Sequence, residues 1–464
     1  MRLLFLHIIL FFSVFFDRLS SQNLIIYGKA LGSDRSKHEI SLYSYSDLIT
    51  KNRIKEAVDT IATDGSFSFN LTVNTIQAVE LQIGNEIAKL YVQPYFQYSV
   101  IFPEKDSINN LNPDIDYKTD LIIYGDSAEL NARIIDYNTQ FDNFWLKKYK
   151  AFVTRKFHFE LDSFKLIVNQ RYSAVKNSYF KSYVEYSLAT IFENTGRAHF
   201  ILAKDYLLDR PVLYAHYEYM EFFNQFFKNY FQRQAATEMG NQILFSINES
   251  ADLAMLSAQL KADPILKNDT LRELVILKNL FDLYYVTGFN KQNILTMTEQ
   301  LLQKTTIKEH RLIAQNILRN FHKLEAGAQA PDFSMLDMNG KINSLADLKG
   351  KFVYVIFFST SADKCLQELK ALEKIYLKYK NDVVFVSISV DDSQQKLRLF
   401  LQRNNKYNWI FLRSDNSKEV REKYDVKTYP IGFLIGRNGS FLSSPSPLPS
   451  EGLEQKLNQL FKRK

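Results

Sequence analysis

The hydrophobic pattern of the 464-residue chain changes its period twice, and this change constrains the fold more than any other feature. Between residues 24 and 103, short apolar or alternating runs rich in Tyr, Phe, Val and Ile are separated by Gly and Asp, as in β structure. Between residues 127 and 324, the apolar residues recur with a helical period. From residue 327 onward, strand-like and helix-like segments alternate, which favours a parallel or mixed sheet with helices on its faces.

A chain of this length is too long for one core, so the three patterns predict a multidomain protein. The expected parts are a small antiparallel, sandwich-like β domain, a central α-helical domain and a C-terminal α/β domain. Asp64-Gly65 is the clearest turn in the first part, because Gly accepts a positive φ without steric cost. The expected boundaries are 1–21 for a signal peptide, then 22–106, 107–325 and 326–464.

Aromatic residues form a stripe in the helical part. They recur with i, i+3, i+4 spacing and would share one helix face: Tyr219, Phe222, Phe223, Phe226, Phe227, Tyr230 and Phe231. Packing between helices is the favoured interpretation, and a groove for a partner peptide is the alternative. A capping-box pattern from Thr270 to Glu273 predicts another helix start, with Gly288 as its stop. Further helices are expected over 128–150, 160–193, 292–304 and 307–323.

The N-terminal segment has the features of an export signal. One Arg precedes an apolar run from Leu3 to Phe16, and the small residues Ser20 and Ser21 follow shortly after. The run is too short to span a bilayer comfortably, so a cleaved signal peptide is favoured over an uncleaved anchor. There is no cysteine at the expected cleavage site, which argues against a lipoprotein. We therefore expect export across the inner membrane, with the mature protein starting near Gln22 in the periplasm.

Composition restricts the chemistry. Cys365 is the only cysteine, which excludes an internal disulfide and a Cys-rich zinc site. There is no phosphate loop, zinc motif or paired-carboxylate signature, so no cofactor or metal is expected. The net charge of +7 is spread over residues of both signs, which argues against nucleic acid as a partner. The composition is compatible with a protein or peptide partner. No later segment is apolar enough for a stable membrane span. The sequence does not indicate the oligomeric state.

Two stretches of the last part carry a family resemblance. They are GAQAPDFSMLDMNGKINSLADLKGKFVYVIFF, over 327–358, and VKTYPIGFLIGRNG, over 426–439. Both resemble the thioredoxin-like domain of bacterial thiol-disulfide oxidoreductases of the TlpA/ResA type, a group that merges into the AhpC/TSA peroxiredoxins. The resemblance implies a thioredoxin-like fold for about the last third of the chain. The preceding β and helical parts resemble the N-terminal extensions of some envelope members.

The resemblance fails at the reactive residues. The family carries Trp-Cys-x-x-Cys at the start of a long helix, whereas residues 361–365 read Ser-Ala-Asp-Lys-Cys. Ala362 therefore stands where the attacking cysteine is implied, and Cys365 stands at the resolving position. Because dithiol cycling needs both thiols, it is excluded within this chain. The resemblance also implies that Glu368 assists proton transfer, and the alternative is an ordinary exposed helix Glu.

Pro430 follows Tyr429 in the second matching stretch. The resemblance implies a cis bond there, facing the cysteine pair, with the neighbouring backbone receiving a substrate strand. This slot could bind peptides without redox chemistry, and the alternative is a turn that only defines the fold.

Cys365 and Glu368 also fit the register of a peroxidatic cysteine. However, Phe358 and Ala362 occupy the positions where that pattern needs a Pro and a hydroxyl residue. There is no His from residue 327 onward, so a Cys-His pair within this part is excluded.

The sequence therefore favours an exported envelope protein that binds or scaffolds a partner through a degenerate thioredoxin-like domain. The alternative is a residual thiol enzyme that uses Cys365, acting in monothiol exchange or as a one-cysteine peroxidase.

Overall fold

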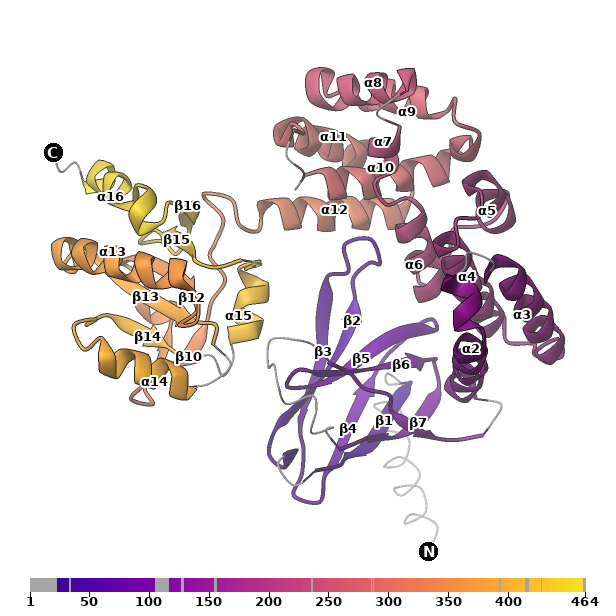
Figure 1. Ribbon diagram of the computed structural model, residues 1–464, viewed down its shortest axis with the longest axis horizontal. Coiled ribbons are helices and arrows are strands. Elements are labelled where there is room, and N and C mark those ends of the chain that lie inside the picture. Colours follow the sequence, from indigo (N-terminus) through magenta and orange to yellow (C-terminus); the bar gives the residue numbers. More distant parts are fainter. Residues whose placement is uncertain are drawn as a thin grey trace, which may run out of the picture. The chain divides into compact units, whose positions relative to one another are not determined.

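A computed structural model describes residues 23–461, apart from 33–34, 105–116, 127–128, 154–156, 235–236, 285, 287, 392–393, 414–416 and 427. The predicted signal peptide lies outside the described residues. The chain divides into two compact units, the first reaching Leu318 and the second running from Arg319 to the C-terminus. Both are drawn in Figure 1. None of the helices in the described part is long and apolar enough to cross a membrane.

The first unit begins with two sheets, one in the strand order β4-β1-β7-β9 and the other β3-β2-β5-β6-β8. Apolar side chains from both sheets form one core, as expected for a sandwich. The antiparallel prediction is wrong in part, because β1 pairs in parallel with β7 and β6 in parallel with β8. The strands are β1 Leu24–Ala30, β2 Glu39–Tyr45, β3 Arg53–Thr60, β4 Ser66–Leu71, β5 Gln77–Ile83, β6 Glu86–Val92, β7 Phe96–Phe102, β8 Tyr117–Lys118 and β9 Ile122–Tyr124.

Helices make up the rest of the first unit, with a π-helical turn at Ser246–Ser250 and a 3-10 turn at Pro264–Leu266. The single helix expected over 160–193 is two, because the chain turns over 172–177 and Asn177 caps the second one through the Phe180 amide. The predicted cap at Thr270 is also wrong, since Asn268 accepts the Leu271 amide instead. The helices are α2 Leu130–Val153, α3 Phe157–Arg171, α4 Ser178–Asn194, α5 His199–Tyr206, α6 Tyr217–Phe226, α7 Tyr230–Arg233, α8 Glu238–Phe245, α9 Leu253–Leu260, α10 Asp269–Leu283, α11 Lys291–Lys304 and α12 Lys308–His322.

The aromatic stripe is buried, which confirms that it is core. Each of its rings is at most 4% exposed, and neighbouring rings pack edge to face or tilted, as Phe226 does on Phe227. The stripe does not follow one helix, however. Asn229 adopts a left-handed conformation with φ of 54°, and this break separates α6 from α7.

Strands and helices of the first unit share polar contacts. The Asn131 side chain at the start of α2 bonds both backbone groups of Tyr91 on β6, at 2.8 and 2.9 Å. The Asn224 amide on α6 donates to the Leu48 carbonyl at 2.7 Å. The strand-rich and helical parts therefore belong to one compact unit, and their division into two domains stays a prediction.

The second unit has a five-stranded sheet in the order β14-β13-β12-β15-β16. β12, β13 and β14 are parallel, whereas β15 and β16 are antiparallel to their neighbours. The α/β prediction for this part is confirmed. Its elements are β10 Ser334–Leu336, β11 Ile342–Ser344, β12 Phe352–Phe358, α13 Asp363–Tyr379, β13 Val383–Ser389, α14 Gln394–Arg403, β14 Ile410–Leu412, α15 Ser417–Lys423, β15 Ile431–Ile435, β16 Phe441–Ser446 and α16 Leu453–Phe461.

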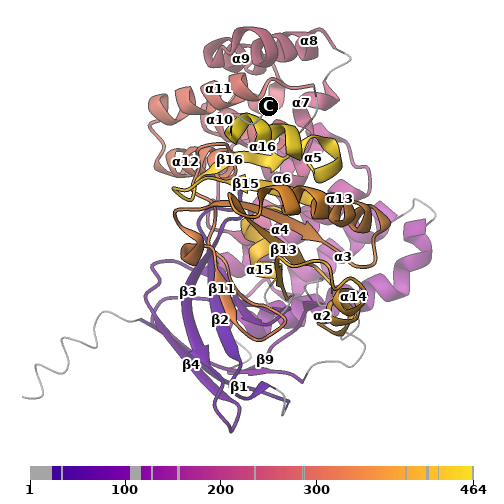
Figure 2. The same ribbon diagram turned by 90° about the vertical axis from the view of Figure 1, so that its left-hand side faces the viewer.

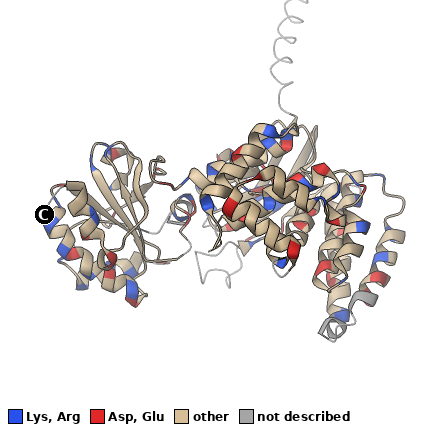
Figure 3. Cartoon of the chain, turned by 90° about the horizontal axis from the view of Figure 1, so that it is seen from above, with Lys and Arg blue, Asp and Glu red and all other residues tan. Residues whose placement is uncertain are grey.

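Both faces of this sheet are covered. Alternate residues of β12 point to opposite sides, so Tyr354 and Ile356 join α13, α14 and α16 in one core. Val353 and Val355 join the other core, which includes Val420 of α15 and the residues Phe333 and Met335 from the segment that precedes β12. Figures 1 and 2 show α13 and α16 on the same side of the strands. Basic and acidic residues intermingle along the helices in Figure 3, in line with the mixed charges of the sequence.

Candidate functional site

The candidate site lies where β12 ends and α13 begins. Phe358 closes the buried strand, four residues form a short loop, and the helix starts at Asp363. Ala362 is the N-cap, with an extended backbone (φ −108°, ψ 116°) and no side-chain hydrogen bond to the helix. Its methyl group neither caps the free amides of the first turn nor acts as a nucleophile. This is the position where the family resemblance implies the attacking thiol.

Cys365 lies in the first turn of α13 and points into the protein. Its side chain is fully buried and belongs to the hydrophobic core that includes Phe358 and Leu369. Burial raises the pKa of the Cys365 thiol above its ordinary value, and the carboxylates of Asp391 and Glu368 act in the same direction. A backbone hydrogen bond from Ser359 opposes this rise. The thiol is therefore both shielded and held in its protonated, poorly nucleophilic form.

Asp391 organises the loop that precedes the helix. This carboxylate is 5% exposed and accepts the hydroxyls of Ser359 (2.7 Å) and Ser389 (2.8 Å) and the Thr360 amide (2.9 Å). Sequence reasoning missed it. The signal was its position two residues after the parallel strand β13, because the carboxyl ends of neighbouring parallel strands meet at one edge of the sheet.

Glu368 is not the exposed helix residue of the alternative interpretation, since it is 2% exposed. Its Oε2 accepts the Ser450 amide at 2.9 Å, and its Oε1 accepts the Ser450 hydroxyl. Ser450 lies in the short 3-10 turn at Pro449–Glu451, which leads into α16. Glu368 therefore fastens this turn to α13, a role that sequence reasoning missed because the partner lies 82 residues away.

Tyr429 and Pro430 lie at the same edge of the sheet as the loop. The bond between them is cis, which confirms the prediction. Pro430 directly precedes β15, whose Ile431 pairs with Phe357 of β12. By this register, Pro430 lies opposite Phe358, where the loop to Ala362 begins. The Tyr429 side chain is 43% exposed, so an aromatic ring is accessible beside this edge.

Comparison with known proteins agrees with this arrangement. A model of the AhpC/TSA family matches residues 326–441. The thioredoxin-like protein YneN of Bacillus subtilis is 29% identical over 151 residues, which are 31% of this chain and 87% of YneN. The thiol-disulfide oxidoreductase ResA of Bacillus anthracis is 30% identical over 127 residues, which are 27% of this chain and 72% of ResA.

One solved structure, the thioredoxin domain of a thiol-disulfide oxidoreductase from Bacteroides vulgatus, is 24% identical. The match covers 30% of this chain and 98% of that one, with a TM-score of 0.28.

The second unit is a thioredoxin-like domain. The chain belongs to the thioredoxin-like thiol-disulfide oxidoreductase family of the ResA type, within the AhpC/TSA group.

Proposed function

We propose that this protein is an exported member of the family whose thioredoxin-like unit binds a peptide or protein partner and performs no dithiol chemistry. The observation that carries the proposal is the state of its one cysteine. Cys365 occupies the resolving position and is fully buried, while Ala362 occupies the attacking position. A thiolate must be accessible to attack a disulfide or a peroxide, and burial disfavours both access and ionisation here.

The binding part of the proposal concerns the sheet edge beside Pro430. The family resemblance implies that active members bind an extended substrate strand at this position. Extended peptides bind sheet edges through main-chain hydrogen bonds. Tyr429 offers an accessible ring next to this edge. The N-terminal apolar run from Leu3 to Phe16 supports the export part, and an exported protein would meet its partner in the cell envelope.

Cys365 should react slowly with a thiol reagent in the native protein. We expect a rate at least about tenfold below that of the unfolded chain, because an opening free energy of about 1.4 kcal/mol already gives this factor. The raised thiol pKa adds a second signature: the native rate should increase mainly above pH 9 and not near neutrality. Labelling with a chromogenic disulfide between pH 6 and 10 measures this, alongside insulin reduction with dithiothreitol. Fast labelling at pH 6, or thioredoxin-like insulin reduction, would instead support the residual thiol enzyme.

Tyr429→Ala should weaken peptide binding by about fivefold to tenfold, the usual effect of removing an aromatic anchor. A suitable probe is a reduced and carboxymethylated model protein, which is unfolded and has no thiol left. Fluorescence anisotropy with the full chain gives the affinity. Tyr27→Ala is the matched control, because Tyr27 is similarly exposed, at 47%, but lies on β1 of the first unit. Equal affinities for the wild type, Tyr429→Ala and Tyr27→Ala would contradict peptide binding beside Pro430.

A further inference from the structure

Strands β2 and β5 of the first unit diverge and leave a wedge between them. They pair only over Ser41–Tyr43 and Glu80–Gln82. Beyond these residues, β2 continues along β3 and β5 continues along β6. The two strands are therefore separated at Tyr45, the last residue of β2, and at Gln77, the first residue of β5.

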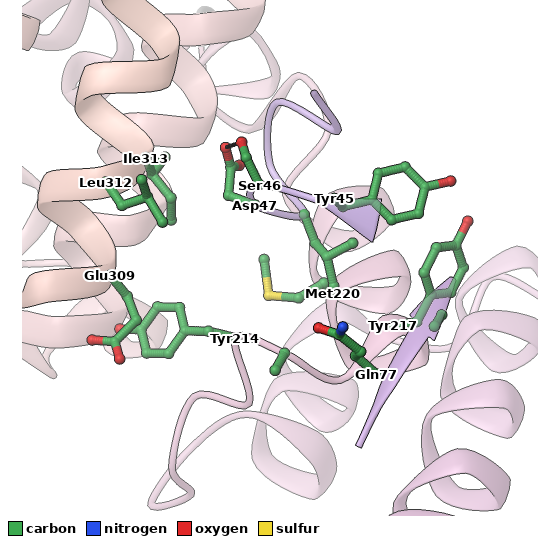
Figure 4. A pocket seen from close by; sticks show the side chains of 13 residues that line it. Tyr45, Ser46, Asp47, Gln77, Tyr214, Tyr217, Met220, Glu309, Leu312 and Ile313 are labelled. Atoms are coloured by element: carbon green, nitrogen blue, oxygen red, sulfur yellow. Dashed lines mark hydrogen bonds between the residues drawn. The ribbon is translucent and has the colours of Figure 1, made fainter. Parts of the chain in front are cut away.

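Helices of the same unit close this wedge into a cavity of about 220 Å³. Met220 of α6 and Leu312 and Ile313 of α12 contribute apolar side chains, as Figure 4 shows. The segment before α6 adds Tyr214 and the first residue of α6 is Tyr217, so segments far apart in the sequence meet here. The site is distinct from the sheet edge in the second unit.

The lining favours an aromatic guest. Tyr214 lies on one side of the cavity and Tyr45 and Tyr217 lie on the other, with the thioether of Met220 between them (Figure 4). Tyrosine rings attract other rings edge to face, and methionine sulfur makes favourable contacts with aromatic groups. A cavity of about 150 Å³ with an apolar lining is large enough for benzene, so this one has room for a bicyclic ring.

Hydrogen-bonding groups restrict the guest further. Gln77 lines the cavity, and no hydrogen bond to its side-chain amide is found among the described residues. The Glu309 carboxylate lies beside Tyr214 at the rim (Figure 4), with 34% of its side chain exposed. Asp47 is also in the lining, but its oxygens already accept the Thr50 amide and the Asn316 amide. These acceptors select for an N–H donor, and the Glu309 carboxylate, which pairs with Lys308 at 3.5 Å, adds an acceptor at the rim.

We propose that the wedge cavity binds a neutral indole ring, either free or as the tryptophan side chain of a peptide. The ring fills the space between Tyr45, Tyr214 and Met220, and its N–H donates to the Gln77 side chain or to Glu309. This binding site lies in a different unit from the peptide slot at Pro430, so a negative result for one proposal does not contradict the other.

The test uses the full chain with indole and with N-acetyltryptophanamide, both neutral, and titration calorimetry as the readout. The wild type should bind at least one of them, and Ala215→Trp should weaken binding at least about tenfold, since its own indole can enter the cavity. Ala215 lines the cavity and is itself exposed, so this change does not require refolding of the core. Ala254→Trp, at an exposed position on α9, is the matched control and should bind as the wild type does.

The two probes separate the two sources of the ring. Binding of both supports a peptide side chain, and binding of indole alone supports a free ligand. 1-Methylindole lacks the N–H and should bind more weakly than indole, and equal binding would overturn the donor assignment. Absence of binding to the wild type, or equal binding by Ala215→Trp, would overturn the proposal.

Discussion

Ala362→Cys should create a working dithiol and give the protein measurable insulin-reducing activity, starting from none. Ala362 is the N-cap of α13, three residues before Cys365, so the two Cβ atoms lie on neighbouring turns at about the spacing that a disulfide requires. The new thiol would sit at the helix N-terminus, where free amides and the helix dipole favour thiolate. With a pKa of about 7, roughly half of it would be ionised at neutral pH, against a few per cent for an ordinary cysteine.

Two neighbouring charges shift the pKa of this new thiol in opposite directions. Asp363 disfavours its thiolate form, while Lys364 favours it. Thiol counts before and after oxidation, followed by insulin turbidity with dithiothreitol, measure the result. Ser361→Cys is the control, because it adds a thiol one residue earlier, at an exposed position with the wrong spacing. If the two thiols of Ala362→Cys never pair, the inward orientation of Cys365 prevents exchange, and the position does not correspond to the family's reactive pair.

Glu218→Gln should make the first unit more stable at pH 8 by up to about 3 kcal/mol and leave it little changed near pH 4.5. Glu218 is in the first turn of α6 and only 8% exposed. Its Oε1 accepts the Tyr91 hydroxyl from β6, whereas no hydrogen-bond partner for its Oε2 is found among the described residues. Burial raises the pKa of the Glu218 carboxyl to about 7, although the Tyr91 hydrogen bond and Lys89 oppose the rise.

The surrounding groups do not neutralise this carboxylate. His216 Nδ1 lies 3.6 Å from Oε2, but burial lowers the pKa of His216 to about 4, so the ring is neutral at pH 8. Burial also lowers the pKa of Lys89, whose ammonium lies 3.4 Å from the ring centroid of Tyr217. On α4, the hydroxyls of Tyr179 and Tyr183 stay protonated because burial raises the pKa of each.

The sign follows from proton binding. The folded pKa of about 7 lies above the ordinary value of 4.5, so the folded state binds more protons than the unfolded state between these values. The stability that this group contributes is therefore complete below about pH 4.5 and is lost as the pH rises through 7. A glutamine side chain can still accept the hydrogen bond from the Tyr91 hydroxyl, and it carries no charge. The variant therefore does not lose stability as the pH rises.

Urea unfolding at pH 4.5, 6, 7 and 8 measures this difference. Trp145 lies in the first unit and Trp409 in the second, so a Trp409→Phe background makes tryptophan fluorescence report the first unit alone. Glu299→Gln is the control, because Glu299 lies on α11 of the same unit and is exposed. Its effect should stay within about 0.5 kcal/mol at every pH. A Glu218→Gln effect that does not change with pH would show that Lys89 keeps the carboxylate ionised throughout.

Local patterns predicted the second unit closely. The alternation from residue 327 onward predicts strands with helices between them, and the run FVYVIFF forms β12, followed by the helix α13, Asp363–Tyr379. A continuous apolar β-branched and aromatic run marks a buried strand, and the small polar residues after it mark its end. α15 and β16 are harder to predict from the sequence, because a short helix and an edge strand carry weak periodic signals.

The first unit was predicted less closely. The strand β3, with the sequence RIKEAVDT, has few apolar residues and therefore no clear strand pattern, yet it pairs along β2. In the stripe from Tyr219 to Phe231, burial was predicted correctly but the break at Asn229 was not. Tertiary packing overrides local preference at such places, since an edge strand or a helix break is stabilised by neighbours remote in sequence.

The sequence by itself determined which reactive atoms exist: one thiol, at Cys365, and a methyl group at Ala362 where the family resemblance implies its partner. No fold can restore dithiol cycling to such a chain, because the chemistry needs two sulfur atoms. The tertiary structure alone decided that the remaining thiol is buried, that Glu368 is tied to Ser450, and that β2 and β5 diverge around a cavity. Burial, pKa and cavity shape depend on contacts between residues tens to hundreds of positions apart, and these contacts exist only once the chain is packed.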